Sequence, residues 1–106
     1  MRIDTYPVND GLVRLAVAGE IDLDTADALT EAVDRVLATD RPAEVVVDLA
    51  EVTLCDSIGI DALLRARAAA AAQAVHLVVI NPRGIVRRAL DVTGTRDRLT
   101  GVPALL

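Results

Sequence analysis

The residues best suited to chemistry stand in the segment Cys55-Asp56-Ser57-Ile58-Gly59-Ile60, directly before an apolar helical pattern. Asp56 is a good N-cap residue, so a helix is expected to begin just after it. The first turn of a helix has unsatisfied N–H groups and the positive end of the helix dipole, and a phosphate is readily accommodated there. Ser57 is therefore a candidate phosphorylation site, with the alternative that its hydroxyl only helps to cap its own helix.

Four acidic residues, Asp22, Asp24, Asp56 and Asp61, are the predicted surroundings of this helix start. A phosphate added among them would bring like charges together and weaken a contact shaped for a neutral hydroxyl. The chemistry to expect is thus the release of a bound partner by local repulsion. For Asp22 and Asp24 a purely structural role is the alternative, because Asp24 is a good N-cap for the helix that follows Gly19.

The other reactive side chains do not combine into a catalytic or metal site. Cys55 stands where the pKa of a thiol could be lowered, but in a chain without a second cysteine a small buried hydrophobic role is favoured. His76 alternates within an apolar strand, and no other His or Cys completes a metal site, so we predict a structural histidine, no metal and no cofactor.

Two enzyme-like interpretations also fail on residue types. Val45 to Leu49 resembles a strand carrying a phosphorylatable aspartate, Asp48, but Asp4 and Asp10 do not form the acidic pair of a receiver domain and the chain has no lysine. There is no G-x-G-x-x-G, no P-loop, and no nucleophile placed beside a histidine. The sequence predicts a binding protein and not an enzyme.

Composition limits the partners further. Eleven basic residues, all arginine, against sixteen acidic ones give a net charge of −5, and an acidic chain is a poor nucleic-acid binder. Tyr6 is the sole aromatic residue, so single-stranded nucleic acid finds no stacking platform. No apolar run approaches the ~20 residues that span a bilayer and none resembles a secretion signal, so we expect a cytoplasmic chain away from membranes. A length of 106 residues suits one domain over residues 1–106.

The elements that must position these residues alternate along the chain. Arg2 to Tyr6 and Leu12 to Ala18 flank the turn signal Asn9-Asp10-Gly11, which predicts an antiparallel hairpin. A first amphipathic helix follows, ended by Pro42, with Glu31 and Arg35 paired on its outer side. Its apolar face is made by Leu29, Ala32, Val33, Val36 and Leu37. Val45 to Leu49 then reads as a buried central strand.

The second half repeats the alternation. The helix after Asp56 runs into Ala68 to Ala72, with Asp61 and Arg65 in the favourable i, i+4 order. Val75 to Ile80 is a strand, and Asn81-Pro82 fits the N-cap and first position of a third helix. That helix is expected to pack through Ile85, Val86, Ala89 and Leu90 and to end near Gly94, leaving Leu99 to Leu106 as an edge strand or a tail. The order β-β-α-β-α-β-α, with a possible short C-terminal element, predicts an α/β fold with a mixed β-sheet.

The motifs as a set resemble one family. Ala18-Gly19-Glu20-Ile21-Asp22, Asp48-Leu49, Cys55 to Ile60 and Val86 to Gly94 are similar, in order and spacing, to the motifs of STAS domains of the bacterial anti-sigma-factor antagonists. The resemblance covers the whole chain. It implies a STAS-type fold and a partner that is an anti-sigma factor, often a serine kinase of the histidine-kinase-like ATPase type, whose capture frees a sigma factor for transcription. The partner-binding residues that it suggests are Asp22, Asp24, Asp56, Ser57, Ile58, Gly59 and Asp61.

One position departs from the family pattern. In switchable members the phosphorylated residue stands immediately before the motif glycine. In this chain that glycine is Gly59 and the residue before it is Ile58, and isoleucine cannot accept phosphate. Ser57 lies one place earlier, and on a helix one residue is a rotation of about 100°, so its hydroxyl need not point where a kinase expects it. A STAS scaffold or signalling-complex subunit without a phosphoswitch is therefore the alternative function. The oligomeric state is not encoded in these patterns.

Overall fold

The computed structural model describes residues 1–9 and 11–101, and these form four strands and four helices. In chain order the elements are β1 (Arg2–Asn9), β2 (Leu12–Ile21), α1 (Ala26–Thr39), β3 (Glu44–Cys55), α2 (Ser57–Ala72), β4 (His76–Ile80), α3 (Gly84–Val92) and α4 (Arg96–Thr100). The predicted hairpin is confirmed by the pairing of β1 with β2, although Asp10 of the turn signal lies outside the described residues.

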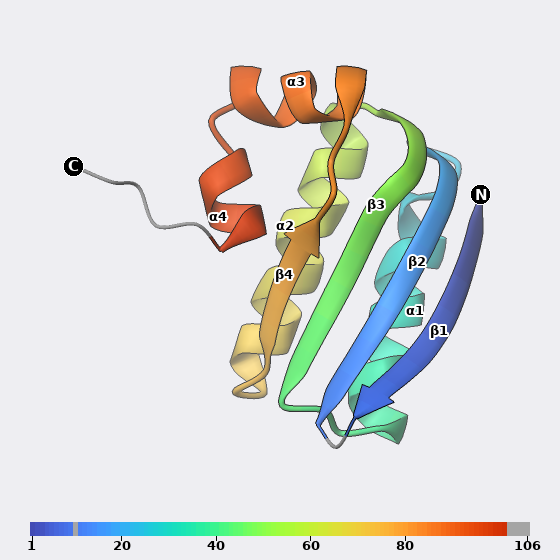
Figure 1. Ribbon diagram of the computed structural model, residues 1–106, viewed down its shortest axis with the longest axis vertical. Coiled ribbons are helices and arrows are strands. Elements are labelled where there is room, and N and C mark those ends of the chain that lie inside the picture. The colour runs from blue at the N-terminus through green and yellow to red at the C-terminus, as the bar shows by residue number, and fades with distance from the viewer. Residues whose placement is uncertain (10, 102–106) are drawn as a thin grey trace.

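The sheet has the strand order β1-β2-β3-β4, in which β1 runs antiparallel to β2 while β2, β3 and β4 are parallel neighbours. The two parallel steps are made by crossovers through α1 and α2, which lie side by side behind the sheet in Figure 1. The predicted mixed α/β sheet is confirmed. As a result, β2 and β3 end at the same end of the molecule. The helix α2 begins there, and α3 lies there as well (Figure 1).

The core between the sheet and the two helices is aliphatic, as the lack of Phe and Trp requires. Along β2 the residues Val13, Leu15 and Val17 are buried in alternation, and Leu29 and Val33 of α1 face them. Ala32 of the predicted apolar face is only half-buried. Among the ion pairs of the described residues, the predicted pair of Glu31 and Arg35 does not occur, so α1 is held by its buried face.

A buried carboxylate ties the strands together on the other face of the sheet. Asp48 of β3 is 7% exposed, and its Oδ2 accepts hydrogen bonds from Arg14 Nε and Nη2 at 3.1 and 2.9 Å. Its Oδ1 accepts from the Ala50 N–H at 3.0 Å and from Asn81 Nδ2 at 3.1 Å. The Arg14 guanidinium also lies 5.2 Å from the centroid of the Tyr6 ring. Groups from β1, β2, β3 and the end of β4 are thereby joined.

The protonation of Asp48 follows from these contacts. Burial by itself would raise its pKa, but the hydrogen bonds from Ala50, Arg14 and Asn81 and the charge of Arg14 together outweigh that effect, and the pKa is lowered. Asp48 is thus a structural anion with every partner supplied by the fold.

The third helix begins later than predicted. Arg83, and not Asn81, is the N-cap residue of α3, because Asn81 adopts a φ of 56° and its side chain donates to Asp48. Val86 and Leu90 are buried as expected, whereas Ile85 points outward and is 62% exposed. The prediction that Ile85 packs inward was therefore wrong.

The C-terminal segment also differs from the expectation. Leu99 and Thr100, the first residues of the segment expected to be an edge strand or a tail, belong instead to the short helix α4, which the fully buried Leu99 anchors. Residues 102–106 of that predicted segment lie outside the described residues. Over the described part of the chain, no helix combines the length and the hydrophobicity that crossing a membrane requires.

Candidate partner-binding surface at the start of α2

Asp56 caps α2 as the sequence predicts. Its backbone is extended, and its Oδ1 accepts a hydrogen bond from the Gly59 N–H at 2.9 Å, while the Ile60 N–H donates to its carbonyl oxygen. The Asp56 N–H in turn donates to the Ile21 carbonyl at the end of β2. The start of α2 is thereby fixed against the end of β2.

Gly59 lets the helix approach that strand closely. A Cβ added at this position would overlap the Ile21 carbonyl oxygen and lie 2.9 Å from Cys55 Sγ. Gly59 is buried, so among the predicted partner-binding residues it is the one that the structure places beneath the surface. Its part in any partner contact is to seat its neighbours Ser57 and Ile58, which are both exposed.

The loop between β2 and α1 lies beside the start of α2 and is closed by its own hydrogen bonds. Thr25 Oγ1 accepts from the Asp22 N–H at 2.9 Å and donates to the Glu20 carbonyl at 2.8 Å. Asp22 Oδ1 accepts from the Asp24 N–H at 3.0 Å. Thr25, without a side-chain cap hydrogen bond, is the residue that precedes α1, so the prediction that Asp24 caps this helix was wrong. Asp22 instead holds the turn, which leaves the Asp24 side chain exposed.

Ser57, Ile58 and Asp61 share the outer face of the first turns of α2. The Asp61 carboxylate forms the predicted i, i+4 ion pair with Arg65, at 2.9 Å. No hydrogen bond of the described residues involves the Ser57 hydroxyl, so the alternative that Ser57 helps to cap its own helix was wrong, and Asp56 alone provides the side-chain cap. Ile58 keeps 38% of its surface exposed, which leaves an apolar side chain at the helix start.

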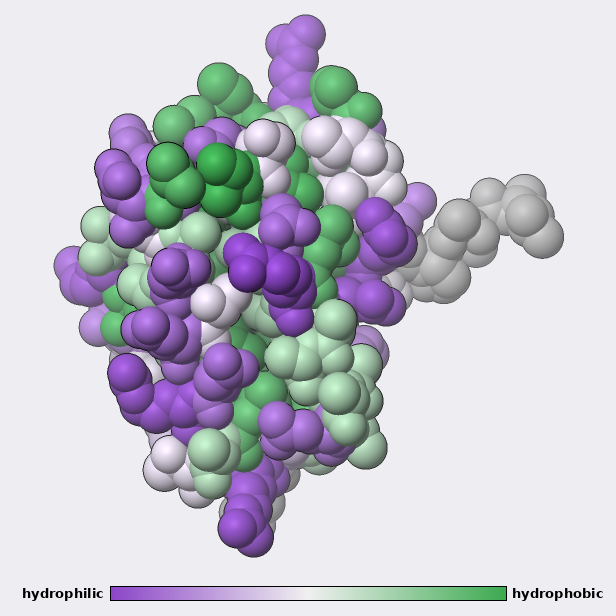
Figure 2. Space-filling model, turned by 180° about the vertical axis from the view of Figure 1, so that it is seen from behind, coloured by the Kyte–Doolittle hydropathy of each residue, from purple (hydrophilic) through white to green (hydrophobic). Residues whose placement is uncertain are grey.

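Two further aliphatic side chains are exposed in the segments that lead into α1 and α2. Leu23, at the tip of the β2–α1 loop, is 70% exposed, and Leu54, near the end of β3, is also exposed. Sequence reasoning missed both, although Leu23 stands between two aspartates and so could have been recognised as an outward-pointing residue. Figure 2 shows apolar side chains, interrupted by polar ones, at the end of the molecule where α2 begins and α3 lies.

We call Asp22, Leu23, Asp24, Ser57, Ile58 and Asp61 the α2-start surface. It combines exposed aliphatic side chains with carboxylates on a rigid frame, and this is the composition of a protein contact with a charged rim.

The reactive groups near this surface are inert. Cys55 is buried beneath Gly59, and burial, with a smaller contribution from the charge of Asp56, raises the pKa of its thiol to about 12. His76 is exposed at the start of β4, which lies near the end of α2 and away from its start. Within the described ranges, His, Cys, Asp and Glu nowhere form a group of three or more that could hold a metal ion.

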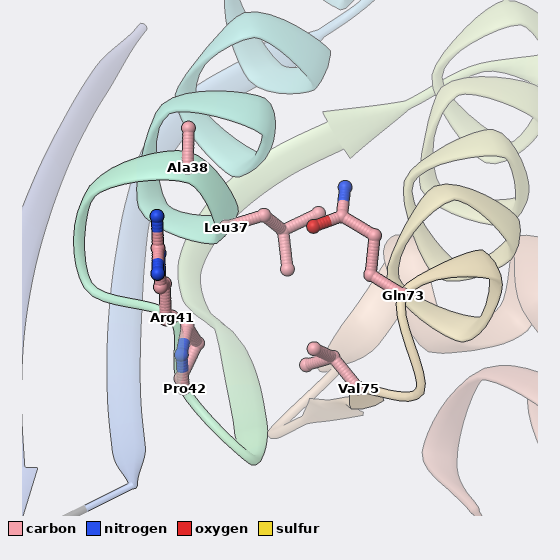
Figure 3. A pocket seen from close by; sticks show the side chains of 6 residues that line it. All are labelled: Leu37, Ala38, Arg41, Pro42, Gln73 and Val75. Carbon is pink, nitrogen blue, oxygen red and sulfur yellow. The ribbon is translucent and has the colours of Figure 1, made fainter.

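A hollow of about 490 Å³ lies at the opposite end of α2, and it is lined by Leu37, Ala38, Arg41, Pro42, Gln73 and Val75. Figure 3 shows these side chains coming from the ends of α1 and α2 and from the segments that follow them. Arg41 is the one ionisable group among them, so this hollow contains no pair of groups for acid–base or nucleophilic chemistry.

Comparison with known proteins places this geometry among relatives. The family model described as "Mlab, STAS domain" matches residues 6–103. The chain is 35% identical over 108 aligned positions to the anti-sigma-F factor antagonist RsfB of Mycobacterium tuberculosis, and the match covers 92% of this chain and 87% of RsfB.

Solved structures agree. A crystal structure of an anti-sigma factor antagonist from Mycobacterium paratuberculosis is 31% identical with a TM-score of 0.73, covering 99% of this chain and 88% of that one. The unphosphorylated form of the anti-sigma factor antagonist SpoIIAA superimposes with a TM-score of 0.76 at 17% identity, over 96% of this chain and 99% of that one, which shows the shared fold.

Proposed function

The chain belongs to the STAS domain family, and from this premise we propose that it is an anti-sigma factor antagonist that binds an anti-sigma factor through the α2-start surface. The observation that carries the proposal is the exposed apolar and acidic surface held rigidly by the Asp56 cap and the Gly59 contact. Two relatives above 30% identity are named as antagonists of this class. Binding would release a sigma factor in the cytoplasm by occupying its inhibitor.

We propose that residues 1–106 act as one STAS domain without catalytic activity. Cys55 is buried with a raised pKa, and Asp48 is fully engaged by Arg14, Asn81 and Ala50. Neither group is free to attack a substrate, and this supports a binding role. The partner in this proposal is an anti-sigma factor with serine kinase activity of the histidine-kinase-like ATPase type.

The same surface predicts that binding is constitutive. Ile58 occupies the family's acceptor position and offers no hydroxyl, so phosphate cannot be added there. A partner that covers the remaining 38% of Ile58 gains about a third of the stabilisation of a fully buried aliphatic side chain, roughly 0.5–1 kcal/mol. That contribution helps to retain the complex and is independent of kinase activity.

A second candidate function is a STAS scaffold or signalling-complex subunit that has no phosphoswitch. Ile58 is the observation that favours it, since the switch is the feature that this residue removes. The two candidates differ in the partner: the antagonist binds an anti-sigma factor and the scaffold does not.

The test is intact-mass spectrometry after incubation with ATP and the kinase that this chain captures from its own host. We expect the wild type to stay unmodified and Ile58→Ser to gain one phosphate and lose affinity for the partner. Ser57→Ala is the matched control, and it should behave like the wild type. Stoichiometric phosphate on the wild type that disappears in Ser57→Ala would overturn constitutive binding and make Ser57 the switch.

A further inference from the structure

The outer face of α3 carries an apolar stripe that the fold leaves uncovered. Ile85 and Val92 are 62% and 79% exposed, and Arg88 lies between them on the same side of the helix. Val86 and Leu90 are buried on the opposite side, which fixes the rotation of α3 about its axis. The stripe therefore cannot turn inward, and it presents two aliphatic side chains about 10 Å apart along the helix.

The same segment is basic in an otherwise acidic chain. Residues 83–98 contain five of the eleven arginines but only two of the sixteen acidic residues. Asp91 is already paired with Arg96 at 3.0 Å. Among the described ion pairs none involves Arg83, Arg87 or Arg88, and all three side chains are exposed. The outer side of α3 thus combines aliphatic residues with unpaired positive charge.

A surface of complementary chemistry lies at the same end of the molecule. The α2-start surface combines Leu23 and Ile58 with the carboxylates of Asp24 and Asp61. Figure 1 shows α3 lying across the end at which α2 begins. In a two-fold symmetric dimer, if patch A of one copy contacts patch B of its partner, then B contacts A as well. Neighbouring acidic and basic apolar patches are what such an interface requires.

We propose that two copies of this chain form a symmetric dimer in which the α3 stripe of each copy covers the α2-start surface of the other. The dimer is held by aliphatic contacts and by pairs between arginine and aspartate, so its affinity falls with increasing salt. The inference rests on the proposed function in that it names the same surface. Self-association covers that surface and competes with the anti-sigma partner, so the dimer must dissociate before the antagonist can bind its partner.

The test is a charge swap measured by sedimentation velocity on the purified chain alone, over a series of concentrations in low and high salt. One variant reverses the acidic patch (Asp24→Arg with Asp61→Arg) and the other reverses the basic patch (Arg83→Glu with Arg88→Glu). Arg67→Glu, which changes an exposed arginine in the later part of α2, is the matched control. Circular dichroism confirms that each variant is folded.

We expect the wild type and Arg67→Glu to dimerise alike, and each patch variant to dimerise at least about tenfold more weakly, because every change acts twice in a symmetric interface. An equimolar mixture of the two patch variants should recover the dimer, since all their charges are again opposite. A wild type that stays monomeric at millimolar concentration, a dimer unaffected by either variant, or a mixture that does not recover would each overturn the proposal. Because no anti-sigma factor is present, those results leave the proposed function to its own test.

Discussion

Gly59→Ala is the perturbation that probes most sharply how the α2-start surface is built. Alanine is the better helix former by up to about 1 kcal/mol, so propensity alone predicts a more stable protein. The structure predicts the opposite, because the new Cβ would overlap the Ile21 carbonyl oxygen and lie 2.9 Å from Cys55 Sγ. The Ile21 atoms are backbone in a paired strand, so no side-chain rotation relieves the overlap.

The magnitude follows from comparing these two effects. Overpacking of a well-packed site costs typically 1–3 kcal/mol, and here it acts on a rigid neighbour, so the upper part of that range applies. After the gain in helix propensity, a net loss of about 1–2 kcal/mol remains. For a domain of this size each 1 kcal/mol shifts Tm by about 4 °C, so Tm should fall by about 4–8 °C.

The assay is thermal and urea unfolding followed by circular dichroism, with Ser57→Ala as the control in the same turn of α2. Ser57 is exposed and its hydroxyl makes no hydrogen bond among the described residues, so its replacement should change stability by less than about 0.5 kcal/mol. If Gly59→Ala proved as stable as the wild type or more so, the close approach of α2 to β2 would be refuted.

Two further predictions concern the buried ionisable groups. Because the pKa of Asp48 is lowered in the folded protein, the stabilisation that its carboxylate provides is complete above the ordinary value of 3.8 and is lost as pH falls through the lower folded-state value. Asp48→Asn should therefore lower the free energy of unfolding in urea by about 1–2 kcal/mol near pH 7 and should weaken the dependence of that free energy on pH in the acid range. An unchanged dependence on acid pH would contradict the assignment. The pKa of Cys55 is raised to about 12, so at pH 8 its thiol should resist alkylation in the native protein and react fully in urea. Mass spectrometry measures the extent of labelling, and rapid labelling of the native protein would contradict this prediction.

The elements that were predicted correctly are those whose signal is local. The β-branched run from Val45 predicts a central strand, and Asp56 before an apolar helical pattern predicts the start of α2, because a cap and its helix are adjacent in sequence. The burial of Cys55 was also predicted correctly, because a lone cysteine favours the role of a small buried hydrophobic residue. Gly59 was recognised as part of a motif, but the contact with Ile21 that requires a glycine there involves a distant strand.

The elements that were missed depend on partners far away in the chain. Asn81 looked like an N-cap, yet its side chain is taken by Asp48, which lies on another strand and needs a donor once buried. Asp24 does not cap α1, because the loop before this helix is closed by hydrogen bonds to the side chains of Asp22 and Thr25. The short helix α4 has little local propensity signal and is held by the burial of Leu99.

The central claim, that the α2-start surface binds an anti-sigma factor, is tested most directly by calorimetric titration. The titrant is the purified anti-sigma factor that the wild-type chain captures from its host, and the samples are wild type, Ile58→Asp, Asp61→Arg and the control Arg67→Glu. Ile58→Asp places a carboxylate in an apolar contact, a change worth about 1–3 kcal/mol, so its Kd should rise by a factor between about 5 and 150. Asp61→Arg should weaken binding by a smaller factor, while Arg67→Glu should bind like the wild type. Equal affinity for all four proteins would contradict the account.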